Sequence, residues 1–243
     1  MMIRKDILII SLLIMKNIQK FKITQIKELR AYLKEKSMPA GLKKNAALEK
    51  KLLAGLQKEA AFKKIPIIDV TTGRFLELIC LLTGPKNILE IGCGNGFSSY
   101  FLIKNLKDGY YTGIDLNQDR VKRAERFIRS KFPKKQFKFL TGNALKLIPE
   151  LQYNFDLVFI DAAKYEYPQY IKTLENKLES GALIIADNIF YKNKIFKRET
   201  VRHDLNSIKG IKEYIRYITD SDDFSSYFFD IGDGISVTKF IKK

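Results

Sequence analysis

The sequence predicts an α/β fold: a mostly parallel sheet of seven strands with helices on both faces and a C-terminal antiparallel hairpin strand. Three observations lead to this prediction. From residue 66 onward, short apolar runs alternate with amphipathic stretches. The runs are apolar almost throughout, as strands covered on both faces must be. An Asp-Gly pair separates the last two runs. Strands separated by helices of this length indicate βαβ units and a parallel sheet.

The individual elements follow from these runs. Strands are expected at residues 87–91, 110–115, 136–141, 157–161 and 182–187. Helices are expected between them at residues 97–106, 118–131, 143–151 and 167–178, with a polar helical stretch at 197–219. The final runs, residues 227–231 and 235–241, flank Gly232-Asp233-Gly234. A turn of this kind joins antiparallel strands.

Residues 1–65 are expected to form a basic helical N-terminal extension, followed by one domain at residues 66–243. The extension contains 16 basic and 5 acidic residues and so supplies +11 of the net charge of +17. A basic segment on a near-neutral body favours a polyanionic partner, either nucleic acid or an anionic membrane surface. The alternative is a solvated helix face in a lysine-rich protein.

Within this extension, residues 7–15 form an apolar run. It is too short to span a bilayer, which needs about 20 apolar residues. No small-residue cleavage motif follows it. The run is therefore interpreted as sequence upstream of a working start near Met15, as a targeting segment, or as an apolar helix packed on a partner subunit. We expect a cytoplasmic protein with no stable membrane span.

A glycine-rich turn follows the first predicted strand. Glycines at positions 92, 94 and 96 let the backbone turn sharply and approach a ligand. Phe97 occupies the place of the last glycine in a dinucleotide fingerprint. Glu90 precedes the turn, and Asp115 ends the second strand, where a carboxylate can accept both hydroxyls of a ribose. The set favours a nucleoside ligand without a pyrophosphate.

Several motifs in this part of the chain carry a resemblance to a known family. They are IPIIDVTTGRFLELI, NILEIGCGNGFSS, GIDLN, TGNA, FIDAAKYEYPQY, IIADN and IGDGISV. The chain resembles the class I S-adenosylmethionine-dependent methyltransferases, and more narrowly the metal-dependent O-methyltransferases of the catechol and caffeoyl-CoA type. These include bacterial relatives that methylate 5-hydroxyuridine in tRNA. The resemblance covers about residues 65–239 and implies a Rossmann-like sheet, S-adenosyl-L-methionine and Mg²⁺ as cofactors, and a homodimer.

Carried over by position, the resemblance implies a cofactor site. The glycine turn and Ser98 would hold the methionine part, Glu90 would support the turn, and Asp115 would bind the ribose. The adenine would lie between Asn143 and Ala144. The full set of expected cofactor-binding residues is Ile68, Glu90, Gly92, Gly94, Gly96, Ser98, Asp115, Asn143, Ala144 and Asp161.

A second group of polar residues follows the fourth and fifth predicted strands. Asp161 ends one strand, and Asp187 and Asn188 end the next. Neighbouring parallel strand tips meet at one crevice, and two carboxylates with an amide oxygen suit Mg²⁺. The alternative is that both aspartates only cap the following helices. Lys164 overhangs the same place, and the resemblance implies that it takes the proton from the acceptor hydroxyl. Asp161 and Lys164 are thus the expected catalytic residues.

The expected function is transfer of a methyl group to an acceptor hydroxyl held by Mg²⁺. The acceptor is a hydroxylated small molecule or, alternatively, tRNA, with 5-hydroxyuridine converted to 5-methoxyuridine at the wobble position. Ala163, where many small-molecule enzymes have aspartate, resembles the tRNA branch. A non-catalytic nucleotide- or nucleic-acid-binding module and an NAD-linked dehydrogenase are the rival interpretations. The single histidine, His203, is expected at the surface.

Overall fold

The computed structural model describes residues 40–197 and 201–241. The chain divides into two compact units, Met1–Leu52 and Leu53–Lys243. Helix α2 (Ala40–Phe62) contains the division, and its later turns bury Leu53, Leu56 and Ala60 within the second unit. The predicted boundary at residue 65 and the predicted extension stay predictions, because most of that segment, with the apolar run at 7–15, lies outside the described residues.

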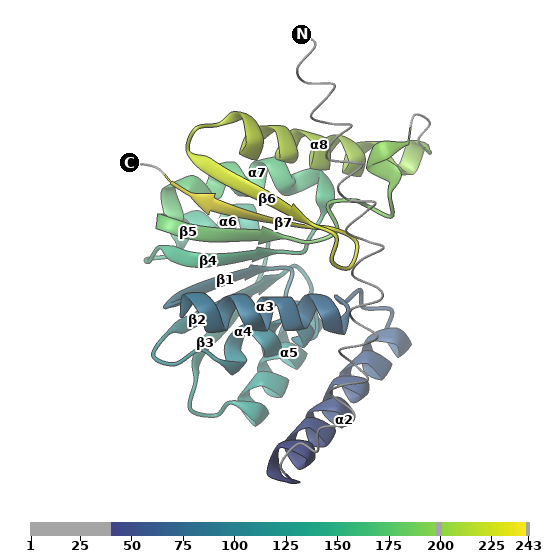
Figure 1. The fold of residues 1–243 in the computed structure, drawn as a ribbon, viewed down its shortest axis with the longest axis vertical. Helices are drawn as coiled ribbons and strands as arrows, with labels where there is room; N and C mark the ends of the chain where they lie inside the picture. Colours follow the sequence, from purple (N-terminus) through teal and green to yellow (C-terminus); the bar gives the residue numbers. More distant parts are fainter. Residues whose placement is uncertain (1–39, 198–200, 242–243) are drawn as a thin grey trace. The chain divides into compact units, whose positions relative to one another are not determined.

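The second unit is built on one sheet of seven strands, in the order β3-β2-β1-β4-β5-β7-β6 (Figure 1). The first five strands along the chain are parallel, whereas β7 pairs antiparallel with both β5 and β6. The predicted fold class is confirmed. The strands are β1 (Asn87–Ile91), β2 (Tyr110–Asp115), β3 (Gln136–Thr141), β4 (Phe155–Ile160), β5 (Leu178–Ala186), β6 (Phe224–Phe229) and β7 (Ile235–Phe240).

Two layers of helices cover the sheet (Figure 1). Helix α4 contacts α3 and α5, and α7 contacts α6 and α8. Right-handed connections place helices on opposite faces when the strand order runs outward from β1 in both directions. The helices are α3 (Val70–Thr83), α4 (Phe97–Lys104), α5 (Gln118–Lys131), α6 (Ala144–Glu150), α7 (Tyr167–Leu174) and α8 (Leu205–Asp220).

The buried strands explain why the apolar runs of the sequence are so complete. Leu89, Val158 and Ile184, on three neighbouring strands, belong to one core cluster that also includes residues of α7 and α8.

Some element boundaries differ from the predictions. α7 ends at Leu174, where a 3₁₀ turn (Glu175–Lys177) leads into an earlier start of β5, and α8 begins at Leu205, after a second such turn (Arg202–Asp204). In the described part of the chain, no helix is both long and apolar enough to cross a bilayer.

Candidate active site

A cavity of about 450 Å³ opens at the carboxyl ends of the parallel strands. The strand order reverses between β1 and β4, and open α/β sheets bind ligands at such a point. The size suits a small-molecule ligand. The walls come from the last residues of the parallel strands, from the segments that follow all five of them and from Pro66 before α3: Pro66, Ile91, Gly92, Gly94, Ile114, Asp115, Leu116, Asn117, Arg120, Gly142, Ala144, Asp161, Ala162, Ala163, Lys164, Tyr170 and Asn188.

The glycine-rich turn forms the end of the cavity next to β2. Gly92 has φ +93°, and a Cβ there would lie 2.1 Å from the carbonyl oxygen of Asp161, so only glycine fits between β1 and β4. Asp115 fixes the turn from the neighbouring strand: its Oδ2 accepts from the Gly94 N–H at 3.0 Å and its Oδ1 from the Asn117 N–H at 2.9 Å. Each carboxylate oxygen can accept more than one hydrogen bond. Asp115 can therefore bind ligand hydroxyls while holding the turn.

Glu90 lies beneath this turn and is fully buried. Its carboxyl group accepts hydrogen bonds from the hydroxyls of Ser98, Ser99 and Tyr111. Burial raises the pKa of Glu90 to about 7, against the opposing effect of these three hydrogen bonds. Glu90 is not among the residues that line the cavity. Its contacts are those of a group that fixes the base of the glycine-rich turn.

The other end of the cavity lies where β4 and β5 finish. Asp187 is buried, and its Oδ1 has no hydrogen-bond donor among the described residues. Burial, followed by the nearby Asp161 carboxylate, raises the pKa of Asp187 to about 7. Asn188 has φ +57°, an unusual backbone conformation that asparagine tolerates, and it lines the cavity with Asp161. Two close carboxyl groups with an unsatisfied oxygen make a site that attracts a cation.

Lys164 connects the two strand ends. Its Nζ donates to Asp161 Oδ1 at 2.9 Å, to the Tyr167 hydroxyl at 2.6 Å and to the Asp187 carbonyl oxygen at 3.2 Å. An ammonium group has three N–H donors, so this set is complete. The buried Tyr167 hydroxyl lies within hydrogen-bonding distance of the Ile160 and Asp187 carbonyl oxygens, to one of which it can donate its proton. Tyr167 therefore holds Lys164 at the tip of β5.

The expected site residues fall into two groups in the structure. Those that line the cavity are Gly92, Gly94, Asp115, Ala144, Asp161, Lys164 and Asn188; those that do not are Ile68, Glu90, Gly96, Ser98, Asn143 and Asp187. Three of the second group directly precede a wall residue in the sequence: Glu90, Asn143 and Asp187. Asn143 Oδ1, for example, caps α6 by accepting from the Leu145 N–H at 2.8 Å. A Cβ on Gly96 would lie 3.1 Å from Ala124, so this glycine allows close packing of α5.

Ten wall residues were not among the predicted site residues, and Pro66, Arg120 and Tyr170 are three of them. Arg120 stands on the first turn of α5, five residues after Asp115, and this nearness to a strand tip could have indicated that it lines the site.

In the described part of the chain, no three His, Cys, Asp or Glu residues gather as metal ligands. The candidate cation site is instead two carboxylates and one amide. His203 is exposed, at 73% of its side chain, beside Asp204.

The chain is similar in sequence to known proteins. A sequence model described as "O-methyltransferase" matches residues 43–241. A catechol O-methyltransferase of Niastella koreensis is 31% identical over 138 residues, which cover 54% of this chain and 62% of that enzyme, less than two thirds of its length.

Solved structures share the fold. The O-methyltransferase from Bacillus cereus in complex with SAH has a TM-score of 0.70 at 24% identity, over 77% of this chain and 90% of that one. The O-methyltransferase TomG from Streptomyces achromogenes, in complex with SAM, has a TM-score of 0.71 at 21% identity, over 78% and 89%. Since the family match spans most of the chain, this protein belongs to the O-methyltransferase family.

Proposed function

We propose that this protein is an S-adenosyl-L-methionine-dependent O-methyltransferase that requires Mg²⁺. The observation that carries the proposal is the pairing of two ends in one cavity. A glycine-rich turn with Asp115 forms one end, and Asp161, Lys164 and Asn188 form the other. A nucleoside-bearing methyl donor and a cation-held acceptor need such a pair of neighbouring sites.

The donor end fits the cofactor by its chemistry. Asp115 offers acceptor oxygens to ribose hydroxyls, and the glycine turn brings backbone close to the ligand without side chains. Gly142 and Ala144 line the wall after β3, where a flat adenine ring would meet little steric obstruction. The cofactor, when bound, supplies a methyl group on a positively charged sulfonium. The SAH and SAM in the two solved O-methyltransferases support this assignment.

The acceptor end fits Mg²⁺ by its donor set. Asp161, Asp187 and Asn188 all offer oxygen, the ligand atom that Mg²⁺ prefers. The buried Asp187 Oδ1 has no partner among the described residues, so a ligand that satisfies it is favoured. Mg²⁺, when bound, supplies positive charge that stabilises an acceptor oxygen as that oxygen loses its proton.

The chain's own residues would then position and deprotonate the acceptor. Lys164 Nζ stands at the cavity wall and, in its neutral form, is the group placed to receive the proton of the acceptor hydroxyl. Tyr167 restricts where Nζ can lie. Most of the rate acceleration would come from alignment of donor and acceptor, for which about 7–11 kcal/mol is available in well-oriented reactions.

For the acceptor we propose a hydroxylated small molecule of the catechol class, as the name of the Niastella relative suggests. The second candidate is tRNA carrying 5-hydroxyuridine. It is favoured by the net charge of +17 and by Arg120 in the cavity wall. The cytoplasmic location and the homodimer stay predictions, which cell fractionation and light scattering of the purified chain would test.

A labelled-cofactor assay tests the proposal. The protein is incubated with methyl-labelled S-adenosyl-L-methionine and either a catechol panel or unmodified tRNA, with Mg²⁺ or with excess chelator. Label should appear in one acceptor, and only with Mg²⁺. Calorimetry with S-adenosylhomocysteine and NAD should show binding of the first alone. Transfer that persists in chelator would refute the Mg²⁺ assignment, and binding of NAD instead would refute the donor assignment.

A further inference from the structure

Helix α5 carries an unusual concentration of arginine. Four of the ten arginines of the chain stand on it at every third position: Arg120, Arg123, Arg126 and Arg129. The chain has 34 lysines, so a general preference for lysine does not account for arginines gathered on one helix. Residues 118–138 hold nine basic and two acidic side chains, a net charge of +7, whereas the rest of residues 66–188 has a net charge of −4. The positive charge of the domain is therefore local.

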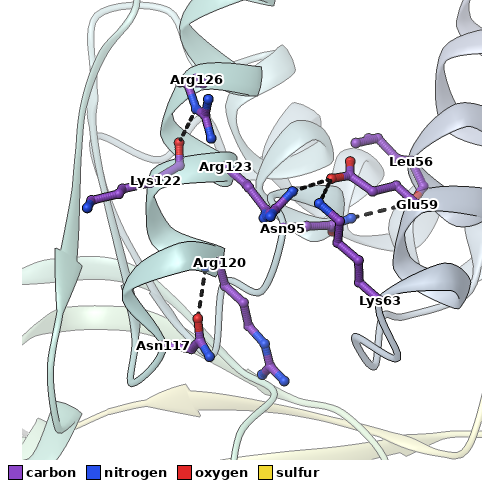
Figure 2. Close-up of polar contacts among 9 residues, drawn as sticks. All are labelled: Leu56, Glu59, Lys63, Asn95, Asn117, Arg120, Lys122, Arg123 and Arg126. Carbon is purple, nitrogen blue, oxygen red and sulfur yellow. Dashed lines mark hydrogen bonds and ion pairs between the residues drawn. The ribbon is translucent and has the colours of Figure 1, made fainter.

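Two of these arginines, Arg123 and Arg120, point away from the other two, as Figure 2 shows in part. Arg123 forms an ion pair with Glu59 on α2 at 2.9 Å, and Lys63 reaches the same carboxylate at 3.1 Å. Arg120 points away from this pair and belongs to the cavity wall. Arg123 thus fastens the end of α2 to α5, and Arg120 connects α5 to the cavity.

Three other cations of α5 lie on one exposed side of the helix. At 100° per residue, Lys122, Arg126 and Arg129 fall within an arc of about 60°. Lys122 and Arg126 are exposed, and neither has an acidic partner among the described residues; Arg126 donates only to the Lys122 carbonyl oxygen, at 3.2 Å. Lys134, also exposed and without such a partner, follows the helix. We call Lys122, Arg126, Arg129 and Lys134 the α5 cationic face.

Two contacts restrict the conformation of the Arg129 side chain. It pairs with Glu125 at 2.9 Å, and its guanidinium carbon lies 4.7 Å from the centre of the Phe137 ring on β3. Its side chain is nevertheless 58% exposed. A guanidinium fixed against a ring keeps N–H groups available and loses little conformational entropy when it binds an anion.

The face lacks the features of a membrane-binding surface. Among residues 118–138 no large apolar side chain is exposed. The exposed apolar residues of the described chain lie elsewhere, for example Leu81 and Leu82 on α3 and Tyr227 on β6. Peripheral membrane binding normally combines cations with inserted apolar groups. Cations alone, with arginine prominent, instead match a phosphate polymer.

We propose that the α5 cationic face binds the phosphate backbone of RNA. Arg120, on the first turn of the same helix, lines the cavity, so an RNA that follows α5 towards that end can present a hydroxylated nucleotide to the cavity. This inference rests on the proposed function in its RNA version, because the reaction needs an acceptor hydroxyl. The contacts are backbone contacts, which give affinity and position without sequence specificity.

A binding experiment without cofactor tests the face separately from catalysis. Fluorescence anisotropy of a short labelled RNA stem-loop is measured with the full chain across about 0.05–0.2 M salt. The test variant is K122Q/R126Q/K134Q. The matched control is K209Q/K212Q/R216Q on α8, which removes the same two lysines and one arginine from an exposed helix of the other layer. Thermal melting verifies that both variants fold.

The α5 variant should bind RNA at least about tenfold more weakly, and its log K against log salt slope should be about two units shallower, since each phosphate contact contributes about 0.7. The α8 variant should stay within about twofold of wild type. Equal weakening in both variants, or no weakening in the α5 variant, would overturn the proposal. Methyl transfer to a catechol by the α5 variant reports on the proposed function independently.

Discussion

Two buried carboxyl groups of this protein share a property and differ in their partners. Glu90 on β1 and Asp187 after β5 are both buried, and burial raises the pKa of each to about 7. Glu90 accepts from three hydroxyls. Asp187 has an oxygen without a donor in the described chain, and its nearest charged neighbours include another carboxylate, Asp161.

This difference in hydrogen-bond partners distinguishes a carboxyl group with a structural role, Glu90, from one that can bind a ligand, Asp187. A buried polar group without a partner costs about 1–3 kcal/mol, which a folded protein retains only where another gain offsets it. At Glu90 the protein supplies the partners itself. At Asp187 the missing partner is the cation of the proposed function. A raised pKa alone would not have distinguished the two groups.

The largest expected effect is at Asp187. The substitution D187N keeps the shape of the side chain but removes the negative charge, so methyl transfer should fall by about 100-fold or more. Binding of S-adenosylhomocysteine, which depends on the other end of the cavity, should change by less than about threefold. E179Q, an exposed acid on β5, is the control and should retain full activity. Activity of D187N near that of the control would remove the distinction between the two acids.

Two buried tyrosine hydroxyls extend the comparison, because one contacts Lys164 in the cavity wall and the other contacts Glu90. Tyr167 holds Lys164, whereas Tyr111 donates to Glu90. Y167F should lower kcat by about tenfold with KM values nearly unchanged, because Lys164 Nζ loses a partner that positions it. Y111F should instead lower the free energy of unfolding by about 1–3 kcal/mol and leave kcat within about twofold. Steady-state kinetics and urea unfolding of both variants measure this, and the reverse pattern would contradict the assigned roles.

The smallest effect is a change in pH dependence at Glu90. Its pKa rises from about 4.5 to about 7 on folding, so its contribution to stability is fully present below about pH 4.5 and is lost as pH rises through about 7. E90Q removes this titration. The melting temperature of wild type minus that of E90Q should therefore fall steadily from pH 5 to about pH 8. A difference that is constant over this range would show that Glu90 does not titrate there.

Much of the fold was predictable from the sequence because buried parallel strands leave a simple pattern. The runs at 87–91, 110–115 and 136–141 coincide with β1, β2 and β3. The start of β5 was placed too late, since Glu179, Ser180 and Gly181 at its beginning are exposed and polar, unlike a buried run. Apolar periodicity reports burial, and exposed strand ends do not carry it.

The site was predictable in its residues more than in its contacts. Position after a strand predicted that Asp161, Asp187 and Asn188 would share one crevice; Asp161 and Asn188 line the cavity, whereas Asp187 is buried and does not. The sequence could not predict that Tyr167 holds Lys164, because helical spacing does not specify which hydroxyl faces which amine. Nor could it separate Glu90 from Asp187, since hydrogen-bond partners come from segments that only folding brings together.

Titration calorimetry of Mg²⁺ into the wild-type chain and D187N tests the central claim most directly. The account predicts that wild type binds one Mg²⁺ and that D187N binds it at least about tenfold more weakly, as loss of a ligand charge requires. E179Q should match wild type. Absence of Mg²⁺ binding to the wild type with cofactor present, or equal affinity in wild type and D187N, would contradict the account.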